Sequence, residues 1–278
     1  MKFIIINSFR IMVYVAYVAI IVAGIALGIY QKGEFTGELI GLSGPLAQVA
    51  DFAVFSFGGW VAASIICGLI VTLMDIRDDI NDRLYAATGW EVVAVPGLIP
   101  EVPFFTLLAN RKFPVTDWIR KPEEFEYIVE PDIFHDLFGH VPLLFNPVFA
   151  DYVQRYGQGG LKAQGLGSCE MLSRLYWYTI EFGLIREAGE LRAYGAGILS
   201  SSGELAYSVQ SPEPQRIPLQ LERTMRTRYK IDTYQQTYFV IDSFEQLFEM
   251  TAADFAPIYE RLRGLPEFAA DEREAVAA

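Results

Sequence analysis

Two long runs of uncharged, mostly apolar residues constrain this chain more than any other feature. Ile11–Tyr30 holds twenty such residues and Phe52–Met74 holds twenty-three. A helix of about twenty apolar residues crosses the hydrocarbon core of a bilayer, so we expect two transmembrane helices over these runs. Gly24 and Gly28 form a G-x-x-x-G pattern, which permits close packing between such helices. A pair of buried core helices is the alternative, and the first run could also be a signal peptide, although it exceeds a typical apolar signal core.

The charges divide the chain into two regions. Residues 1–74 carry three basic and three acidic side chains, so the formal net charge of −12 lies entirely in residues 75–278. An acidic protein repels phosphates, which argues against a nucleic-acid partner. We therefore expect residues 1–75 to form a membrane segment, residues 76–267 a separate domain and residues 268–278 a frayed acidic tail.

The flanking charges predict the topology of the two runs. Lys2 and Arg10 precede the first run, whereas the linker Gln31–Asp51 holds one lysine and three acids. The positive-inside rule places the N-terminus and the domain after Asp75 in the cytoplasm and the linker outside. The chain holds only two cysteines, which provides no disulfide framework and suits a reducing compartment. If the N-terminal segment is not native to the protein, the whole chain is expected to be cytoplasmic.

Both histidines of the sequence lie in the short segment Pro131–Pro142. His135 and His140 are five residues apart. On a regular α-helix five residues turn through about 500°, so the two imidazoles would point about 140° apart. We expect Gly139 to permit a break in the helix and Pro142 to end it, so that the second imidazole swings back toward the first.

Glu181 is the best candidate for a third ligand beside these imidazoles. It lies in the apolar and aromatic run Met171–Ile185, which is expected to be a helix. An acid in such a run is costly unless it is paired or bound to a metal. Two histidines and one carboxylate with open positions form the facial triad of non-heme Fe(II) oxygenases. A zinc hydrolase uses the same donors, but no H-E-x-x-H general base follows the first histidine.

Long segments between about Ile80 and about Phe255 match one known family, in order and nearly without gaps. The matching segments are Leu84–Trp90, Val95–Ile99, Pro131–Leu144, Tyr176–Leu184 and Ala193–Glu204. Together they resemble the pterin-dependent aromatic amino acid hydroxylases, most closely the bacterial phenylalanine 4-hydroxylases. The resemblance implies a mostly α-helical catalytic fold with short β-strands, here preceded by the two expected transmembrane helices.

The resemblance also implies an activity. Fe(II) is expected on His135, His140 and Glu181, and a tetrahydropterin, such as tetrahydrobiopterin, is expected to supply two electrons. Dioxygen would then hydroxylate the ring of L-phenylalanine to give L-tyrosine, a step in phenylalanine catabolism. The sequence leaves tyrosine and tryptophan open as other ring substrates.

The family motifs assign further roles by resemblance. Arg120 is expected to bind the substrate carboxylate, Trp177 to wall the substrate ring, and Ser200 to orient His135 beside the substrate. The residues expected at the pterin are Gly97, Ile99, Phe104, Asp136 and Tyr176. Simpler readings stay open for several of them: a surface salt bridge for Arg120, a solvated helix position for Asp136, and a Pro/Gly turn before a core aromatic for the pterin loop. Glu204, the last residue of the last matching segment, could be only a capping acid.

Other stretches predict the surrounding elements. We expect strands at Glu91–Val95 and Phe113–Arg120, a helix over Asn146–Leu166 with a glycine-rich loop, and helices over Leu219–Arg226 and Ser243–Leu262. Family catalytic domains have helical sequence before the first motif, where this chain has its apolar segment. A membrane scaffold or fusion product with a truncated, inactive hydroxylase part is therefore the alternative, although no ligand position is lost.

Overall fold

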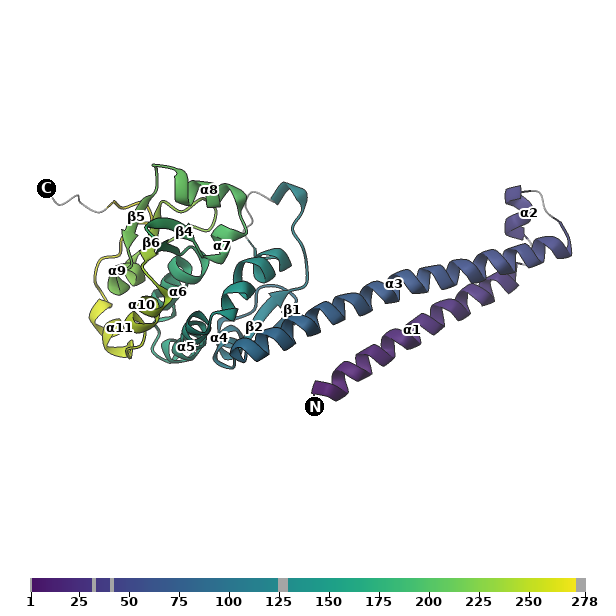
Figure 1. Cartoon of the computed structure of the whole chain (residues 1–278), viewed down its shortest axis with the longest axis horizontal. Helices are drawn as coiled ribbons and strands as arrows, with labels where there is room; N and C mark the ends of the chain where they lie inside the picture. The colour runs from purple at the N-terminus through teal and green to yellow at the C-terminus, as the bar shows by residue number, and fades with distance from the viewer. Residues whose placement is uncertain (1, 32–33, 41–42, 125–129, 274–278) are drawn as a thin grey trace. The chain divides into compact units, whose positions relative to one another are not determined.

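The computed structural model describes residues 2–31, 34–40, 43–124 and 130–273 of the chain. It divides into two compact units, the N-terminal unit Met1–Asp79 and the C-terminal unit Ile80–Ala278. Figure 1 shows the elements of both units along the chain.

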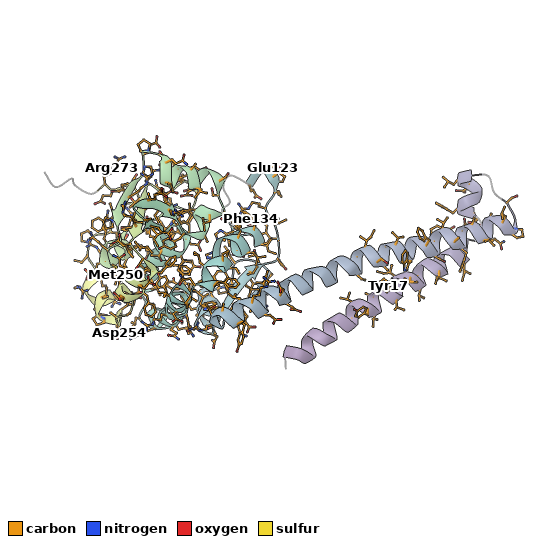
Figure 2. The ribbon with its side chains drawn as sticks, in the orientation of Figure 1. Tyr17, Glu123, Phe134, Met250, Asp254 and Arg273 are labelled. Carbon is orange, nitrogen blue, oxygen red and sulfur yellow. The ribbon has the colours of Figure 1, made fainter. Side chains whose placement is uncertain are left out.

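Helices make up the described part of the N-terminal unit. They are α1 (Lys2–Gln31), α2 (Glu34–Ile40) and the first part of α3 (Pro45–Thr88), so both long helices extend beyond the predicted runs. Within them, Met12–Gln31 and Pro45–Gly68 are long and apolar enough to cross a membrane, by length and composition. Figure 2 shows the side chains drawn on α1, among them Tyr17, projecting from the helix.

Glycines bring the backbones of α1 and α3 into contact. A Cβ added at Gly24 would lie 2.7 Å from the carbonyl oxygen of Phe55, and one added at Gly28 would lie 2.8 Å from the Cα of Phe52. These distances are shorter than ordinary carbon contacts, so a larger side chain at either glycine would push the helices apart. The close packing that the G-x-x-x-G pattern predicted is therefore present.

The C-terminal unit is mostly helical with short strands, as predicted. Its first sheet consists of two parallel strands, β1 (Glu91–Val95) and β2 (Lys112–Thr116). Helix α4 (Glu101–Ala109) connects these strands along the chain. Its second sheet has the order β4-β3-β6-β5. The strands of this sheet are β3 (Leu184–Glu187), β4 (Glu190–Ala193), β5 (Gln215–Pro218) and β6 (Thr237–Ile241). Helices α5 (Pro147–Gly165), α6 (Cys169–Tyr176), α7 (Ala196–Leu199), α8 (Ser202–Gln210), α9 (Leu221–Arg226), α10 (Phe244–Met250) and α11 (Ala256–Leu262) complete the unit.

Helix α5 is the centre of the core. Asn146 caps it by accepting hydrogen bonds from the backbone N–H groups of Val148 and Phe149. Gly157 and Gly160 lie inside this helix, where they let α4 approach: a Cβ at Gly160 would lie 2.2 Å from the Phe105 ring. These two glycines therefore serve helix packing, and the predicted glycine-rich loop is wrong at their positions.

Several predicted elements have different bounds in the structure. The helix expected over Met171–Ile185 changes at Trp177 into a wider turn and gives way to strand β3 at Leu184. The helix expected over Ser243–Leu262 divides into α10 and α11, and the strand expected over Phe113–Arg120 ends at Thr116.

The predicted fraying of the tail is wrong for its first residues. The N–H of Phe268 donates to the carbonyl of Arg226, and its ring lies 3.4 Å from the Arg223 guanidinium carbon. This contact holds the chain beyond α11 to α9. Residues 274–278 of the predicted tail lie outside the described residues.

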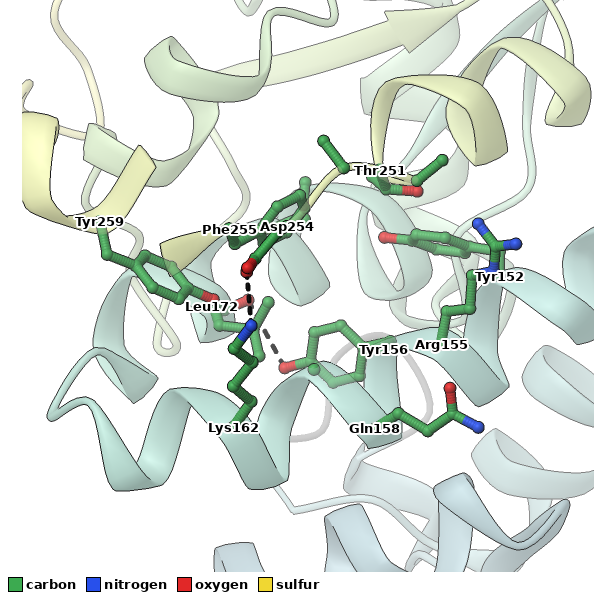
Figure 3. Close-up of a pocket in the computed structure, with 14 residues that line it drawn as sticks. Tyr152, Arg155, Tyr156, Gln158, Lys162, Leu172, Thr251, Asp254, Phe255 and Tyr259 are labelled. Carbon is green, nitrogen blue, oxygen red and sulfur yellow. Dashed lines mark hydrogen bonds and ion pairs between the residues drawn. The ribbon is translucent and has the colours of Figure 1, made fainter. Parts of the chain in front are cut away.

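A cavity of about 450 Å³ opens between α5 and the chain around α10 and α11. Figure 3 shows Lys162 and Asp254 at this cavity, with an ion pair of 2.6 Å between them, and the Tyr156 hydroxyl directed at the carbonyl of Leu172. None of the three predicted metal ligands lines it, so the predicted chemistry lies elsewhere in the unit.

Candidate functional site

The two histidines lie at the ends of one π-helical turn, His135–His140. In this wider helix each N–H bonds five residues back, as the N–H of Val141 does to the carbonyl of Asp136. A five-residue spacing therefore returns to the same face, and the Nε2 atoms of His135 and His140 lie 3.0 Å apart. The predicted break of the helix is wrong: the helix widens instead.

Gly139 serves a different purpose from the predicted break. A Cβ at this position would lie 2.8 Å from the Cβ of Ala196, so only glycine lets α7 approach the turn. Helix α7 ends at Leu199 and is followed by Ser200, whose Oγ lies 2.9 Å from Nδ1 of His135. When Nδ1–H donates to this hydroxyl, Nε2 keeps its lone pair for a metal.

Glu181 completes the cluster from a second π-helical turn, Trp177–Glu181. The N–H of Phe182 bonds to the carbonyl of Trp177, 2.8 Å away, which marks the widened geometry. The Glu181 carboxylate oxygens lie 3.4 Å from Nε2 of His135 and 3.3 Å from Nε2 of His140. One donor atom from each residue thus lies within 4.8 Å of the others.

The electrostatics of the cluster favour an ionised Glu181 carboxylate and a positive charge opposite it. Burial raises the pKa of the Glu181 carboxyl, but the two imidazoles outweigh burial and hold that pKa well below its usual range. Burial opposes a charge on His135, whereas Glu181 raises the pKa of that imidazole above its ordinary value. Two imidazole nitrogens and one carboxylate that converge in this way fit a divalent transition metal.

A cavity of about 260 Å³ adjoins this cluster. It is lined by the three converging residues and by all five residues predicted at the pterin, Gly97, Ile99, Phe104, Asp136 and Tyr176. Asp136 is buried and accepts hydrogen bonds from the N–H and hydroxyl of Thr116, at 2.7 and 2.9 Å. The solvated position considered for Asp136 is therefore wrong, and burial raises the pKa of its carboxyl.

A second cavity, of about 510 Å³, also borders the cluster and shares His135, Glu181, Phe104 and Tyr176 with the first. Trp177 and Ser200 line it together with His135 and Glu181, so two of the three predicted substrate residues lie beside the predicted ligands. An aromatic wall of this kind suits a planar ring.

Arg120 does not line either of these cavities. Its side chain is fully buried, and it donates two hydrogen bonds to Asp132 and one to the carbonyl of Ser200, at 2.7 Å. The surface salt bridge considered for Arg120 is therefore wrong. The Arg120 guanidinium outweighs the effect of burial and lowers the pKa of the Asp132 carboxyl. The buried pair fixes the turn at Ser200, which contacts His135.

Sequence reasoning missed two buried polar residues around the site, Asp132 and Gln235, and considered only a capping role for a third, Glu204. Glu204 accepts hydrogen bonds from the N–H of Gln235 and the hydroxyl of Tyr238, so it is more than a capping acid. Burial raises the pKa of Glu204 to about 7, although both hydrogen bonds lower it. The family motif ended at Glu204, which was a usable signal; Gln235 stood in no motif.

The fold and the cluster define a facial-triad type of metal site in a mostly helical domain, and comparisons with known proteins specify the family. Residues 66–261 match the family described as biopterin-dependent aromatic amino acid hydroxylase. The phenylalanine-4-hydroxylase of Ralstonia nicotianae is 61% identical over 195 residues, which cover 70% of this chain. That of Chromobacterium violaceum is 62% identical over 183 residues, which cover 66% of this chain.

Solved structures agree with this assignment. A cobalt-bound phenylalanine hydroxylase from C. violaceum is 58% identical with a TM-score of 0.70, and the match covers 71% of this chain and 72% of that one. A structure of the same enzyme with iron and phenylalanine has a TM-score of 0.68 at 57% identity, with the same coverage. The chain belongs to the biopterin-dependent aromatic amino acid hydroxylases. It spans 62% of the length of each of the two curated relatives above.

Proposed function

We propose that this chain hydroxylates the ring of L-phenylalanine to give L-tyrosine, with Fe(II), a tetrahydropterin and dioxygen. The observation that carries the proposal is the convergence of His135, His140 and Glu181 beside one cavity that also gathers the five predicted pterin residues. The names of the relatives, phenylalanine-4-hydroxylase, support phenylalanine as the substrate.

The three converging side chains would hold the iron and leave positions open toward both cavities. When bound, the iron would activate dioxygen and the tetrahydropterin would supply two electrons, so that one oxygen atom is inserted into a ring C–H bond as a hydroxyl and the other leaves as a hydroxyl on the pterin. Gly97 and Ile99 would line the pterin.

The chain's own residues bind and orient the two organic partners. Phe104 and Tyr176, whose ring centroids lie 5.7 Å apart, would pack against the pterin, and Asp136 would accept a hydrogen bond from it. Trp177 would wall the substrate ring. Arg120 would attract the substrate carboxylate, for which its bonds to Asp132 and Ser200 would have to rearrange.

The test is an assay of the full chain in mild detergent with Fe(II), a tetrahydropterin and phenylalanine, with tyrosine as the readout and bound iron measured in parallel. We expect about one iron per chain and formation of tyrosine. Bound iron without tyrosine would contradict phenylalanine as the substrate, and tyrosine and tryptophan would then be assayed. Failure to bind iron would favour the inactive scaffold.

We further propose that residues 1–75 form a two-pass membrane segment and residues 76–267 a cytoplasmic catalytic domain. Support comes from the two apolar helices, whose outward side chains include Val15 and Ile65, 63% and 65% exposed. Membrane fractions should retain the full chain through an alkaline carbonate wash. Release of the chain into the supernatant would contradict the proposed membrane segment and favour a cytoplasmic protein.

A further inference from the structure

Trp177 lines the cavity of about 510 Å³ and is held there by three contacts. Its ring stacks on Tyr229, with centroids 4.3 Å apart and planes 14° apart, and packs on Phe182 at 4.6 Å. Its indole Nε1–H donates to Oε1 of Gln235, 3.0 Å away. All three rings line the cavity, so the one polar contact decides how the indole is turned within the stack.

Gln235 also holds the loop that follows Tyr229 and that contributes to the lining of the same cavity. Its Nε2 donates to the carbonyls of Lys230 and Thr233, at 2.9 and 3.2 Å. This loop follows Tyr229 and carries Ile231, which lines the same cavity. The Gln235 side chain is 2% exposed, so these bonds form away from water, where an unmade bond costs most.

Glu204 anchors Gln235 to the rest of the unit. Its Oε1 accepts the N–H of Gln235 at 3.0 Å and the hydroxyl of Tyr238, on the buried strand β6, at 2.8 Å. The N–H of Glu204 bonds to Oγ of Ser201, the neighbour of Ser200. A chain of hydrogen bonds therefore joins the turn at Ser200, strand β6, the loop and Trp177.

We propose that Gln235 and Glu204 are positioning residues that hold Trp177 and the loop after Tyr229, and thereby set how an aromatic ring is placed for hydroxylation. Neither residue lines the cavity, so both act through the residues they hold. An amide suits this position because it accepts the indole N–H and donates to two carbonyls together. The inference rests on the proposed function, because it concerns the ring that this chain would hydroxylate. Misplacement of a reacting ring by about 1 Å can lower the rate about 100-fold.

Two measurements on the full chain in detergent test the proposal. Gln235→Leu removes the acceptor and both donors, whereas Gln236→Leu is the matched control at the exposed neighbouring position. In Gln235→Leu, amide hydrogen exchange of residues 229–235 should rise. With Fe(II) and a tetrahydropterin, KM for phenylalanine should rise about tenfold, as expected for the loss of buried hydrogen bonds, and less tyrosine should form per pterin oxidised. KM for the pterin should not change, and Gln236→Leu should match the wild type.

The outcomes separate the two proposals. Unchanged exchange in Gln235→Leu overturns the network, whereas raised exchange with wild-type KM and coupling overturns the positioning role. If exchange rises but the wild-type chain forms no tyrosine, the proposed function fails while the structural network stands. Should Gln235→Leu not fold, Trp177→Phe carries the test, because it removes the indole donor to Gln235 and keeps an aromatic ring in the stack. Wild-type phenylalanine KM and coupling in that variant would overturn the proposal.

Discussion

The two units of this chain place apolar side chains in opposite ways. In the N-terminal unit, Leu46 is 64% exposed and Val15 is 63% exposed, and the close contacts are made by glycine backbones. In the C-terminal unit, Leu108 and Trp90 are fully buried in one continuous core. The difference teaches that apolar side chains can remain at the surface of one region while they form the interior of the other.

The largest expected effect concerns the cluster that only the C-terminal unit contains. His135→Ala removes one of three converging ligands, and even residues that merely orient a ligand cost about 10–100-fold when lost. Activity should therefore fall by at least about 100-fold and bound iron should be lost, while the carbonate-resistant membrane fraction stays unchanged. Full turnover in this variant would refute the site, and release from the membrane would refute the independence of the units.

A matched pair of leucines sharpens the contrast in packing. Leu108→Ala should lower the free energy of unfolding by about 2–5 kcal/mol, because it leaves a cavity in the core. Leu46→Ala, at an exposed position of α3, should change it by less than about 0.5 kcal/mol. Thermal unfolding of both variants in detergent measures the difference. Equal losses would show that the N-terminal unit has an interior of its own.

The pH dependence of stability should come from the C-terminal unit through Glu204. Its pKa is about 7 in the folded chain against an ordinary 4.5, so the folded state binds the proton more tightly. The tighter proton binding contributes about 3 kcal/mol to the free energy of unfolding. This contribution is fully present below pH 4.5 and is lost as pH rises through about 7. Urea titrations of the wild type and Glu204→Gln between pH 5 and pH 8 test this, and parallel curves would contradict it.

The smallest expected effect lies in the N-terminal unit. A Cβ at Gly59 would lie 3.0 Å from the Cα of Gly24, whereas one at Gly58 would meet nothing within 4 Å. Gly59→Ala should therefore destabilise the helix pair by about 1 kcal/mol relative to Gly58→Ala. A titration with sodium dodecyl sulfate, followed by circular dichroism, compares the two. If Gly58→Ala is the more damaging change, the two helices meet on another face.

The sequence was sufficient to identify the three converging side chains because their positions were chemically unusual. The chain's two histidines lie in one short segment, and Glu181 is an acid among aromatic residues. The geometry that unites them was not predictable by the same reasoning, because an α-helical period of 3.6 residues was assumed where both turns have the wider π-helical form.

Buried polar partners were harder to predict than ligands. Arg120 was expected in the substrate cavity by family resemblance, yet Asp132 and the carbonyl of Ser200 occupy its guanidinium. Asp132 lies only three residues before His135 and carried no periodic signal. A hydrogen-bond network such as that of Gln235 depends on segments far apart in the sequence, which only the fold brings together.

The two widened turns have a consequence for how this site tolerates change in chain length. Each ligand segment contains about one residue more per turn than an α-helix would use. Loss of a single residue between His135 and His140 would return the turn to an α-helix with a four-residue spacing, in which the two imidazoles point only about 40° apart. Homologous sequences should therefore tolerate loss of one residue within these turns more readily than loss of one residue within a regular helix.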